Sequence, residues 1–284
     1  MLVVLIIPLR NVVNMTSSFF NAFVVLLSFV LVIKVSAIDF RIIGGLHAPE
    51  EYGRFHASVQ NLTGHHVCGG AVVSQWFVVS AAHCVHKANP RFMKIVAGTN
   101  NLDVGGKRCD VSRIIVHRRY NSTSRQHDIA LLKTKSPFDF EIIKPLKLSK
   151  RELHEGDEIV LVGFGASEPH GSSSRIMYTL EMPVFNQEIC EYAMRYSRPV
   201  TKEMFCTFTQ IGQGTCHGDS GSPLVIGNEL VGIVSWGIPC AVGFPDVHTR
   251  LAPYVDWIKM HIREGYCGAP KRQFFMQSNV SNQQ

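Results

Sequence analysis

The stretch from which the fold can be inferred reads Gly212-Gln213-Gly214-Thr215-Cys216-His217-Gly218-Asp219-Ser220-Gly221-Ser222-Pro223. It places Ser220 among glycines, where a backbone can bend sharply and expose one hydroxyl. Taken alone, such a run is more often a surface turn than an active site. A serine hydroxyl becomes a good nucleophile only beside a base, usually an imidazole oriented by a carboxylate. The stretch therefore directs attention to a histidine and an aspartate elsewhere in the chain.

Two upstream segments supply these residue types. Ser80-Ala81-Ala82-His83-Cys84 ends an apolar run, and His127-Asp128-Ile129-Ala130-Leu131-Leu132 places an acid at the head of another. Singly, His83 would be an ordinary surface or core histidine and Asp128 a turn residue. Together with Ser220 they follow one of the known chain orders of a Ser-His-Asp triad.

The chain between these segments favours an all-β fold. Short runs rich in β-branched residues are separated by Gly, Asn, Asp or Ser, which is typical of a barrel or a sandwich. The exception is 253–262, where apolar residues recur at helical spacing after Pro253, and Gly265 lies beyond the expected end. We expect a C-terminal α-helix at about 253–263.

Composition narrows the class of protein. The 284 residues are 46% hydrophobic, which excludes a wholly disordered chain. The formal net charge is +6, but no dense run of Lys and Arg is interleaved with aromatics. We therefore expect no nucleic-acid partner.

The N-terminal segment predicts secretion. Residues 19–33 are almost wholly apolar, and Val35-Ser36-Ala37 offers small residues for signal-peptide cleavage after Ala37. Met15 is an alternative start. The rival interpretation is a membrane anchor through residues 1–37, but the apolar run is shorter than the roughly 20 residues that a bilayer span needs. Eight cysteines without a zinc-binding pattern indicate disulfides and an oxidising compartment. We expect a secreted, extracellular protein without stable membrane association.

The sequence resembles the secreted trypsin-like serine proteases of the chymotrypsin fold, from Ile42 to about Cys267. The landmarks, in order, are Ile42-Ile43-Gly44-Gly45, Cys68-Gly69-Gly70, Ala81-Ala82-His83-Cys84, Asp128-Ile129-Ala130-Leu131-Leu132, Gly218-Asp219-Ser220-Gly221 and Ser235-Trp236-Gly237.

The resemblance implies two six-stranded antiparallel β-barrels, at about 42–150 and 151–252, with the active site in the cleft between them. The expected organisation is completed by a signal peptide (1–37), a short activation peptide (38–41), a protease domain (42–267) and a loose C-terminal tail (268–284).

The resemblance also implies the chemistry of a serine endopeptidase. Ser220 attacks the peptide carbonyl to form an acyl-enzyme, His83 accepts and returns the proton, and Asp128 orients the imidazole. The backbone N–H groups of Gly218 and Ser220 form the oxyanion hole. No cofactor is implied. The rival class is a catalytically inactive homologue that acts as a binding module, although all three triad residues are present.

Activation is implied in the same way. Cleavage of the Arg41–Ile42 bond by another protease would release an ammonium group at Ile42, which folds inward to pair with Asp219. The uncut chain is then an inactive zymogen.

The resemblance pairs Cys68 with Cys84, Cys190 with Cys206, and Cys216 with Cys240. Cys109 and Cys267 fall outside this pattern, and we expect them to pair, with free thiols or an intermolecular bridge as rivals. No Glu occurs from Val85 to His127, so no calcium site of the kind found in some trypsins, and no other metal site, is expected.

Specificity is less clearly indicated. Gly214, next to Thr215, stands where trypsins carry the aspartate at the base of the substrate pocket, and Ser235, Trp236 and Gly237 form walls with room for a large side chain. Asp246 falls at a position that is usually Gly, a combination that resembles arthropod chymotrypsin-like and collagenolytic proteases. We expect chymotrypsin-like or broad cleavage; the alternatives are Lys/Arg specificity through Asp246, or an Asp246 that only bonds the local backbone.

The expected partners are protein or peptide substrates, an activating protease, and serpins or small protein inhibitors; the enzyme is expected to be a monomer. Ser222, where most relatives carry Gly, is expected to strain the turn after the nucleophile.

Overall fold

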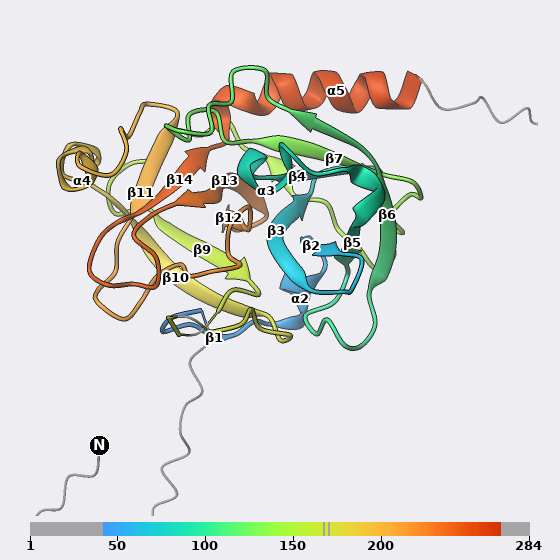
Figure 1. The fold of residues 1–284 in the computed structure, drawn as a ribbon, viewed down its shortest axis with the longest axis horizontal. Coiled ribbons are helices and arrows are strands. Elements are labelled where there is room, and N and C mark those ends of the chain that lie inside the picture. Colours follow the sequence, from blue (N-terminus) through green and yellow to red (C-terminus); the bar gives the residue numbers. More distant parts are fainter. Residues whose placement is uncertain (1–41, 167, 170, 268–284) are drawn as a thin grey trace, which may run out of the picture. The chain divides into compact units, whose positions relative to one another are not determined.

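The computed structural model of the chain describes residues 42–166, 168, 169 and 171–267. The predicted signal peptide (1–37), the activation peptide (38–41) and the tail (268–284) lie outside the described residues. Figure 1 shows two β-rich halves, the earlier one in blue to green and the later one in yellow to red, with the last helix along one side. No helix among the described residues is both long and apolar enough to cross a membrane.

Six antiparallel strands close into the first barrel, in the order β2-β3-β4-β7-β6-β5. Their interior is filled by small and β-branched side chains such as Ala57, Val59 and Ile95, which fit a strongly curved sheet. The strands are β2 (His56–Asn61), β3 (His66–Val72), β4 (Phe77–Ser80), β5 (Met93–Ala97), β6 (Lys107–Val116) and β7 (Ala130–Thr134). Short helical turns accompany them at α2 (Glu50–Gly53), α3 (Ala82–Val85) and η1 (Pro90–Phe92).

The second barrel also has six antiparallel strands, in the order β10-β11-β14-β13-β12-β9, and it closes because β9 pairs with β10. Its strands are β9 (Glu158–Gly163), β10 (Tyr178–Phe185), β11 (Met204–Thr207), β12 (Pro223–Ile226), β13 (Glu229–Trp236) and β14 (Asp246–Arg250). Two short strands join its edges: β1 (Leu46–His47) pairs with β10, and β8 (Lys147–Leu148) pairs with β13. The helix α4 (Gln187–Met194) precedes β11. The prediction of two six-stranded barrels is confirmed.

The C-terminal helix begins with the turn η2 (Ala252–Tyr254), which contains Pro253, and continues as α5 (Val255–Cys267). Val255 and Ile258 are fully buried in a cluster that also contains residues of both barrels. The helix runs beyond the predicted end at about residue 263, and Gly265 lies within it rather than after it. A Cβ at Gly265 would lie 2.5 Å from Phe77, so glycine permits the close approach of the helix to β4.

Three disulfides link the pairs that the family resemblance implied: Cys68–Cys84, Cys190–Cys206 and Cys216–Cys240. Cys109 is buried in the core of the first barrel, where the Ser136 hydroxyl lies 3.3 Å from its sulfur. The side chain of Cys267 lies outside the described residues, so the Cys109–Cys267 pair stays a prediction.

Candidate active site

The structure brings the three predicted triad residues together from distant parts of the chain. His83 lies in α3 directly after β4, and Asp128 lies just before β7, both in the first barrel. Ser220 lies on the turn before β12 of the second barrel. His83 and Ser220 line one pocket of about 250 Å³.

Asp128 holds His83 at two points. Its Oδ1 accepts a hydrogen bond from the backbone N–H of His83 at 2.8 Å, and its Oδ2 lies 2.7 Å from Nδ1 of the ring. The Ser235 hydroxyl donates to the same Oδ2 at 2.6 Å. With both ends of the histidine fixed, the ring presents its other nitrogen, Nε2, away from the carboxylate.

The carboxyl group of Asp128 is fully buried. Burial raises its pKa to about 7, while the hydrogen bond from Ser235 and the charge of Arg125 lower it. The ionised form therefore depends on the donors and positive charges that surround it.

Ser220 sits on a turn whose backbone only glycine adopts easily. Gly218 has a φ of 95° and Gly221 a φ of 76°. A Cβ at Gly221 would lie 2.6 Å from the Gly69 carbonyl oxygen, so the turn packs closely against β3. The N–H of Gly69 donates to the Ser220 carbonyl at 2.8 Å and ties the turn to the first barrel.

Several polar groups at the site have no partner within the described part of the chain. The Ser220 hydroxyl and Nε2 of His83 make no hydrogen bond there, and neither do the backbone N–H groups of Gly218 and Ser220. These groups are all available to a bound substrate, and hydrogen bonds between a nucleophile and its base commonly tighten only on binding.

Asp219, next to Ser220, points into the protein. It is fully buried, and its two oxygens accept hydrogen bonds from the backbone N–H groups of Gly165 and Cys216, each at 3.0 Å. Burial raises its pKa to about 7. A Cβ at Gly165 would lie 2.1 Å from the carboxylate, so this position must lack a side chain. No basic side chain among the described residues forms an ion pair with Asp219.

Ile42, the first described residue, is fully buried in the core of the second barrel. The next residue, Ile43, accepts a hydrogen bond from the N–H of Gly214 at 3.1 Å. Arg41, the predicted cleavage residue, lies outside the described residues.

Asp246, a residue predicted to line the substrate pocket, is buried beside Thr215. Its Oδ2 accepts from the Thr215 N–H at 2.8 Å, and its Oδ1 accepts from the Thr215 hydroxyl at 2.7 Å. A Cβ at Gly214 would lie 2.7 Å from this carboxylate, and one at Gly237 would lie 3.0 Å from it. Burial raises the pKa of Asp246 to about 6. Thr215, Ser235, Trp236 and Gly237 line the pocket that contains His83 and Ser220, whereas Gly214 and Asp246 do not.

The turn accommodates Ser222 through neighbours that were not identified from the sequence. The Ser222 hydroxyl lies 3.4 Å from Nε2 of His56. A Cβ at Gly69 would lie 2.0 Å from this hydroxyl, so the absence of a side chain at Gly69 leaves room for it. His66 supports the same turn: its Nε2 lies 2.9 Å from the Gly218 carbonyl. The expected strain at Ser222 is therefore not required, because the hydroxyl has both room and a partner.

Sequence reasoning also missed the bond from Ser235 to Asp128 and two arginines of the pocket, Arg125 and Arg198. Ser235 had been assigned only as a pocket wall. The arginines stand singly in the sequence and belong to no motif, so no local signal could have found them.

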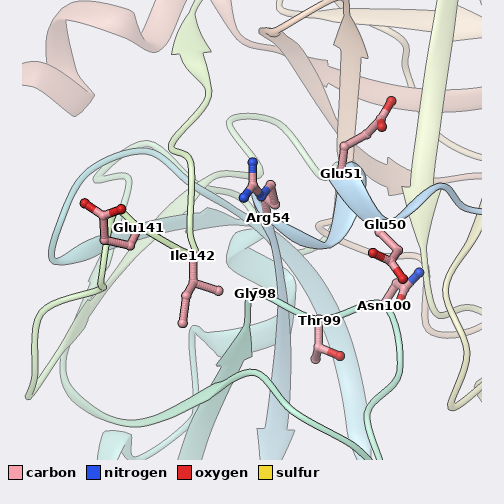
Figure 2. Close-up of a pocket in the computed structure, with 8 residues that line it drawn as sticks. All are labelled: Glu50, Glu51, Arg54, Gly98, Thr99, Asn100, Glu141 and Ile142. Carbon is pink, nitrogen blue, oxygen red and sulfur yellow. The ribbon is translucent and has the colours of Figure 1, made fainter.

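A larger pocket, of about 500 Å³, contains none of the predicted catalytic residues. Figure 2 shows it beside α2, with the carboxylates of Glu50, Glu51 and Glu141 pointing in different directions. All three side chains are exposed, and they do not converge on a common point.

Comparison of the sequence with known proteins identifies the family of this chain. The family model described as Trypsin matches residues 42–258. Chymotrypsin-2 of Vespa crabro is 33% identical over 220 residues, covering 77% of this chain and 98% of the relative. Trypsin of Phaedon cochleariae is 35% identical over 202 residues (68% and 78%), and Trypsin II-P29 of Gallus gallus is 35% identical over 229 residues (78% and 89%). The chain therefore belongs to the trypsin family of serine endopeptidases.

Proposed function

We propose that the protein hydrolyses peptide bonds of protein substrates through an acyl-enzyme, with Ser220 as nucleophile, His83 as general base and Asp128 as the group that orients it. The observation that carries this proposal is the two-point hold of Asp128 on His83 at 2.8 and 2.7 Å, with Ser220 in the same pocket.

Each step uses an atom described above. Ser220 Oγ adds to the carbonyl carbon while Nε2 of His83 takes its proton, and the imidazolium then gives that proton to the leaving amine. A water molecule then attacks the acyl-enzyme with His83 again as the base, and the acyl group is released. The unpartnered N–H groups of Gly218 and Ser220 would bind the oxyanion, which is typically worth about 3 kcal/mol for each donor.

Activation by cleavage of Arg41–Ile42 is part of the proposal. Its support is Asp219, a buried carboxylate without an ion pair in the described chain, and Ile42, which is fully buried in the core of the second barrel. A buried carboxylate left unpaired is costly, and a new ammonium group at Ile42 would neutralise it. We expect the Arg41→Gln variant to remain uncut and inactive.

For specificity, we propose cleavage after large hydrophobic residues, with tolerance of Lys and Arg. The two bonds from Thr215 to Asp246, together with the burial of that carboxylate, support the hydrophobic preference, because each oxygen already has a donor. Kinetics on matched Phe, Leu, Arg and Lys substrates test this; a hundredfold preference for Arg would overturn it.

Secretion through a signal peptide ending at Ala37 remains a proposal as well. Three disulfides among the described residues support an oxidising compartment. N-terminal sequencing of the exported protein tests the cleavage position.

The catalytic assignment can be tested by labelling with a phosphonate that reacts with activated serines. The activated protein should be labelled at Ser220, and Ser220→Ala should abolish both labelling and peptide hydrolysis. Ser222→Ala is the matched control, because its hydroxyl lies on the same turn but faces His56. A protein that is not labelled and hydrolyses no peptide would instead be an inactive homologue.

A further inference from the structure

Two arginines line the pocket that contains His83 and Ser220. Arg125 lies on the loop that leads from the first barrel's β6 to Asp128, and Arg198 lies between α4 and β11 of the second barrel. Both side chains are partly buried. The two guanidinium groups thus reach one pocket from opposite halves of the protein.

Neutral groups hold both arginines. Arg125 donates from Nη1 to the Tyr120 hydroxyl at 3.1 Å, and its buried Nε has no partner in the described structure. Arg198 donates from Nε to the Thr123 carbonyl at 3.2 Å, and its guanidinium lies 5.6 Å from the centre of the Trp236 ring.

Neither arginine forms an ion pair with any described carboxylate. Asp128 is the acidic group that most affects Arg125, but both of its oxygens are already bonded to His83 and Ser235. Burial lowers the pKa of Arg125, while the charge of Asp128 raises it and the charge of Arg198 lowers it. Two cations therefore share a partly desolvated pocket in which no described carboxylate forms an ion pair with either of them.

A carboxylate is the ligand that this arrangement lacks. Arginine presents its N–H groups as a planar fork that matches a carboxylate and can bind both of its oxygens. An incoming negative charge would relieve the repulsion between the two guanidinium groups. Apart from His83 and His217, the remainder of the pocket lining contains no ionisable side chain, and no acidic one.

We propose that Arg125 and Arg198 bind an acidic side chain of the peptide substrate, so that the enzyme prefers Glu or Asp close to the scissile bond. The inference rests on the proposed function. Trp236, against which Arg198 lies, stands between the pocket walls Ser235 and Gly237, so the acidic residue flanks the one that enters the specificity pocket.

Matched peptides test the proposal. Each contains Phe before the scissile bond, and Glu is compared with Gln at every flanking position in turn. We expect kcat/KM to be about tenfold higher for Glu than for Gln at one or more positions, because a hydrogen bond to a charged group typically contributes about this factor. The ratio should fall as salt concentration rises, because screening weakens the attraction of a partly exposed pair.

Variants identify the residues responsible. Arg198→Gln should bring the Glu-to-Gln ratio close to one, and Arg198→Glu should make Lys better than Gln at the same position. Arg125→Gln should reduce the ratio in the same direction. The matched control is Arg195→Gln: this arginine is exposed, stacks on Tyr192 and Tyr196, and does not line the pocket, so its loss should leave the ratio unchanged.

The outcomes separate the two proposals. An enzyme that is labelled at Ser220 and cleaves Glu and Gln peptides equally at every position overturns the inference about the arginines alone. A ratio that Arg195→Gln reduces as much as Arg198→Gln also overturns it, since general surface charge would then explain the preference. Failure of labelling and of all cleavage would refute the proposed function itself.

Discussion

Asp128 and Asp219 are both fully buried, and burial raises the pKa of each to about 7, yet their surroundings differ. Asp128 has three hydrogen-bond contacts, to the His83 N–H, the His83 ring and the Ser235 hydroxyl, and the positive charge of Arg125 lies nearby. Asp219 has only two backbone N–H groups. The first carboxylate is complete within the described chain, whereas the second lacks a positive charge. Equal burial therefore does not imply an equal role.

The largest expected effect follows from breaking the complete site. Asp128→Asn should lower kcat by about 10³- to 10⁴-fold, because the amide stabilises the wrong tautomer of His83; the size is that of the same change in the chymotrypsin triad. Steady-state kinetics after active-site titration measure it. Asp110→Asn, an exposed aspartate of the same barrel, is the control. A loss below tenfold would contradict the role given to Asp128.

Asp219→Asn tests the incomplete site. After cleavage at Arg41, the variant should lose about 3 to 5 kcal/mol of the free energy of unfolding, because the Ile42 ammonium would be buried without its partner. In the uncut chain the same change should cost little or even stabilise the fold, because it removes a buried carboxylate that has no ion-pair partner among the described residues. Urea unfolding of both forms gives the comparison. Equal losses in the two forms would show that no ion pair forms on activation.

Ser235→Ala removes one donor from Asp128 without removing a charge. We expect kcat/KM to fall about tenfold, the usual value of a hydrogen bond to a charged group. Loss of this bond should also raise the pKa of Asp128, so the acidic limb of the pH–rate profile should move to higher pH. Ser235→Thr keeps the hydroxyl and should recover most of the activity. An unmoved acidic limb would mean that the bond affects only packing.

The smallest expected effect is a pH dependence of stability in the uncut chain. The pKa of Asp219 is raised from 3.8 to about 7, so the folded state binds more protons than the unfolded state between these values. The contribution of Asp219 to the free energy of unfolding must therefore decrease as pH rises from about 4 to 7.

This effect can be isolated in the Arg41→Gln background by subtracting the unfolding free energy of Asp219→Asn at each pH. The subtraction removes the contributions of the buried histidines, which titrate in the same range. The unfolding free energy with Asp219 should fall, relative to that with Asn at this position, as pH rises. This dependence on pH should weaken when the parent chain, with Arg41 intact, has been cleaved. A difference independent of pH would contradict the raised pKa.

The relation between sequence and structure differs from residue to residue. His83, Asp128 and Ser220 could be selected from the sequence because each lies in a local motif, and the order of the three motifs along the chain is typical of a Ser-His-Asp triad. Glycine commonly ends helices, which predicts Gly265 beyond the C-terminal helix, but it lies inside α5, where a Cβ would come within 2.5 Å of Phe77. Local propensity gave way there to packing between segments far apart in the chain.

The sequence by itself indicated an all-β fold and the candidates for the triad, because these depend on residue types at short spacing, and the resemblance carried by its motifs implied the family and the two barrels. Only the tertiary structure decided which partners the polar groups take. Ser235 bonds Asp128 across 107 positions of the chain, Asp246 bonds Thr215, and Arg125 and Arg198 meet at one pocket. Hydrogen bonds and charge interactions act over a few ångströms, and the closure and packing of the two barrels set those distances.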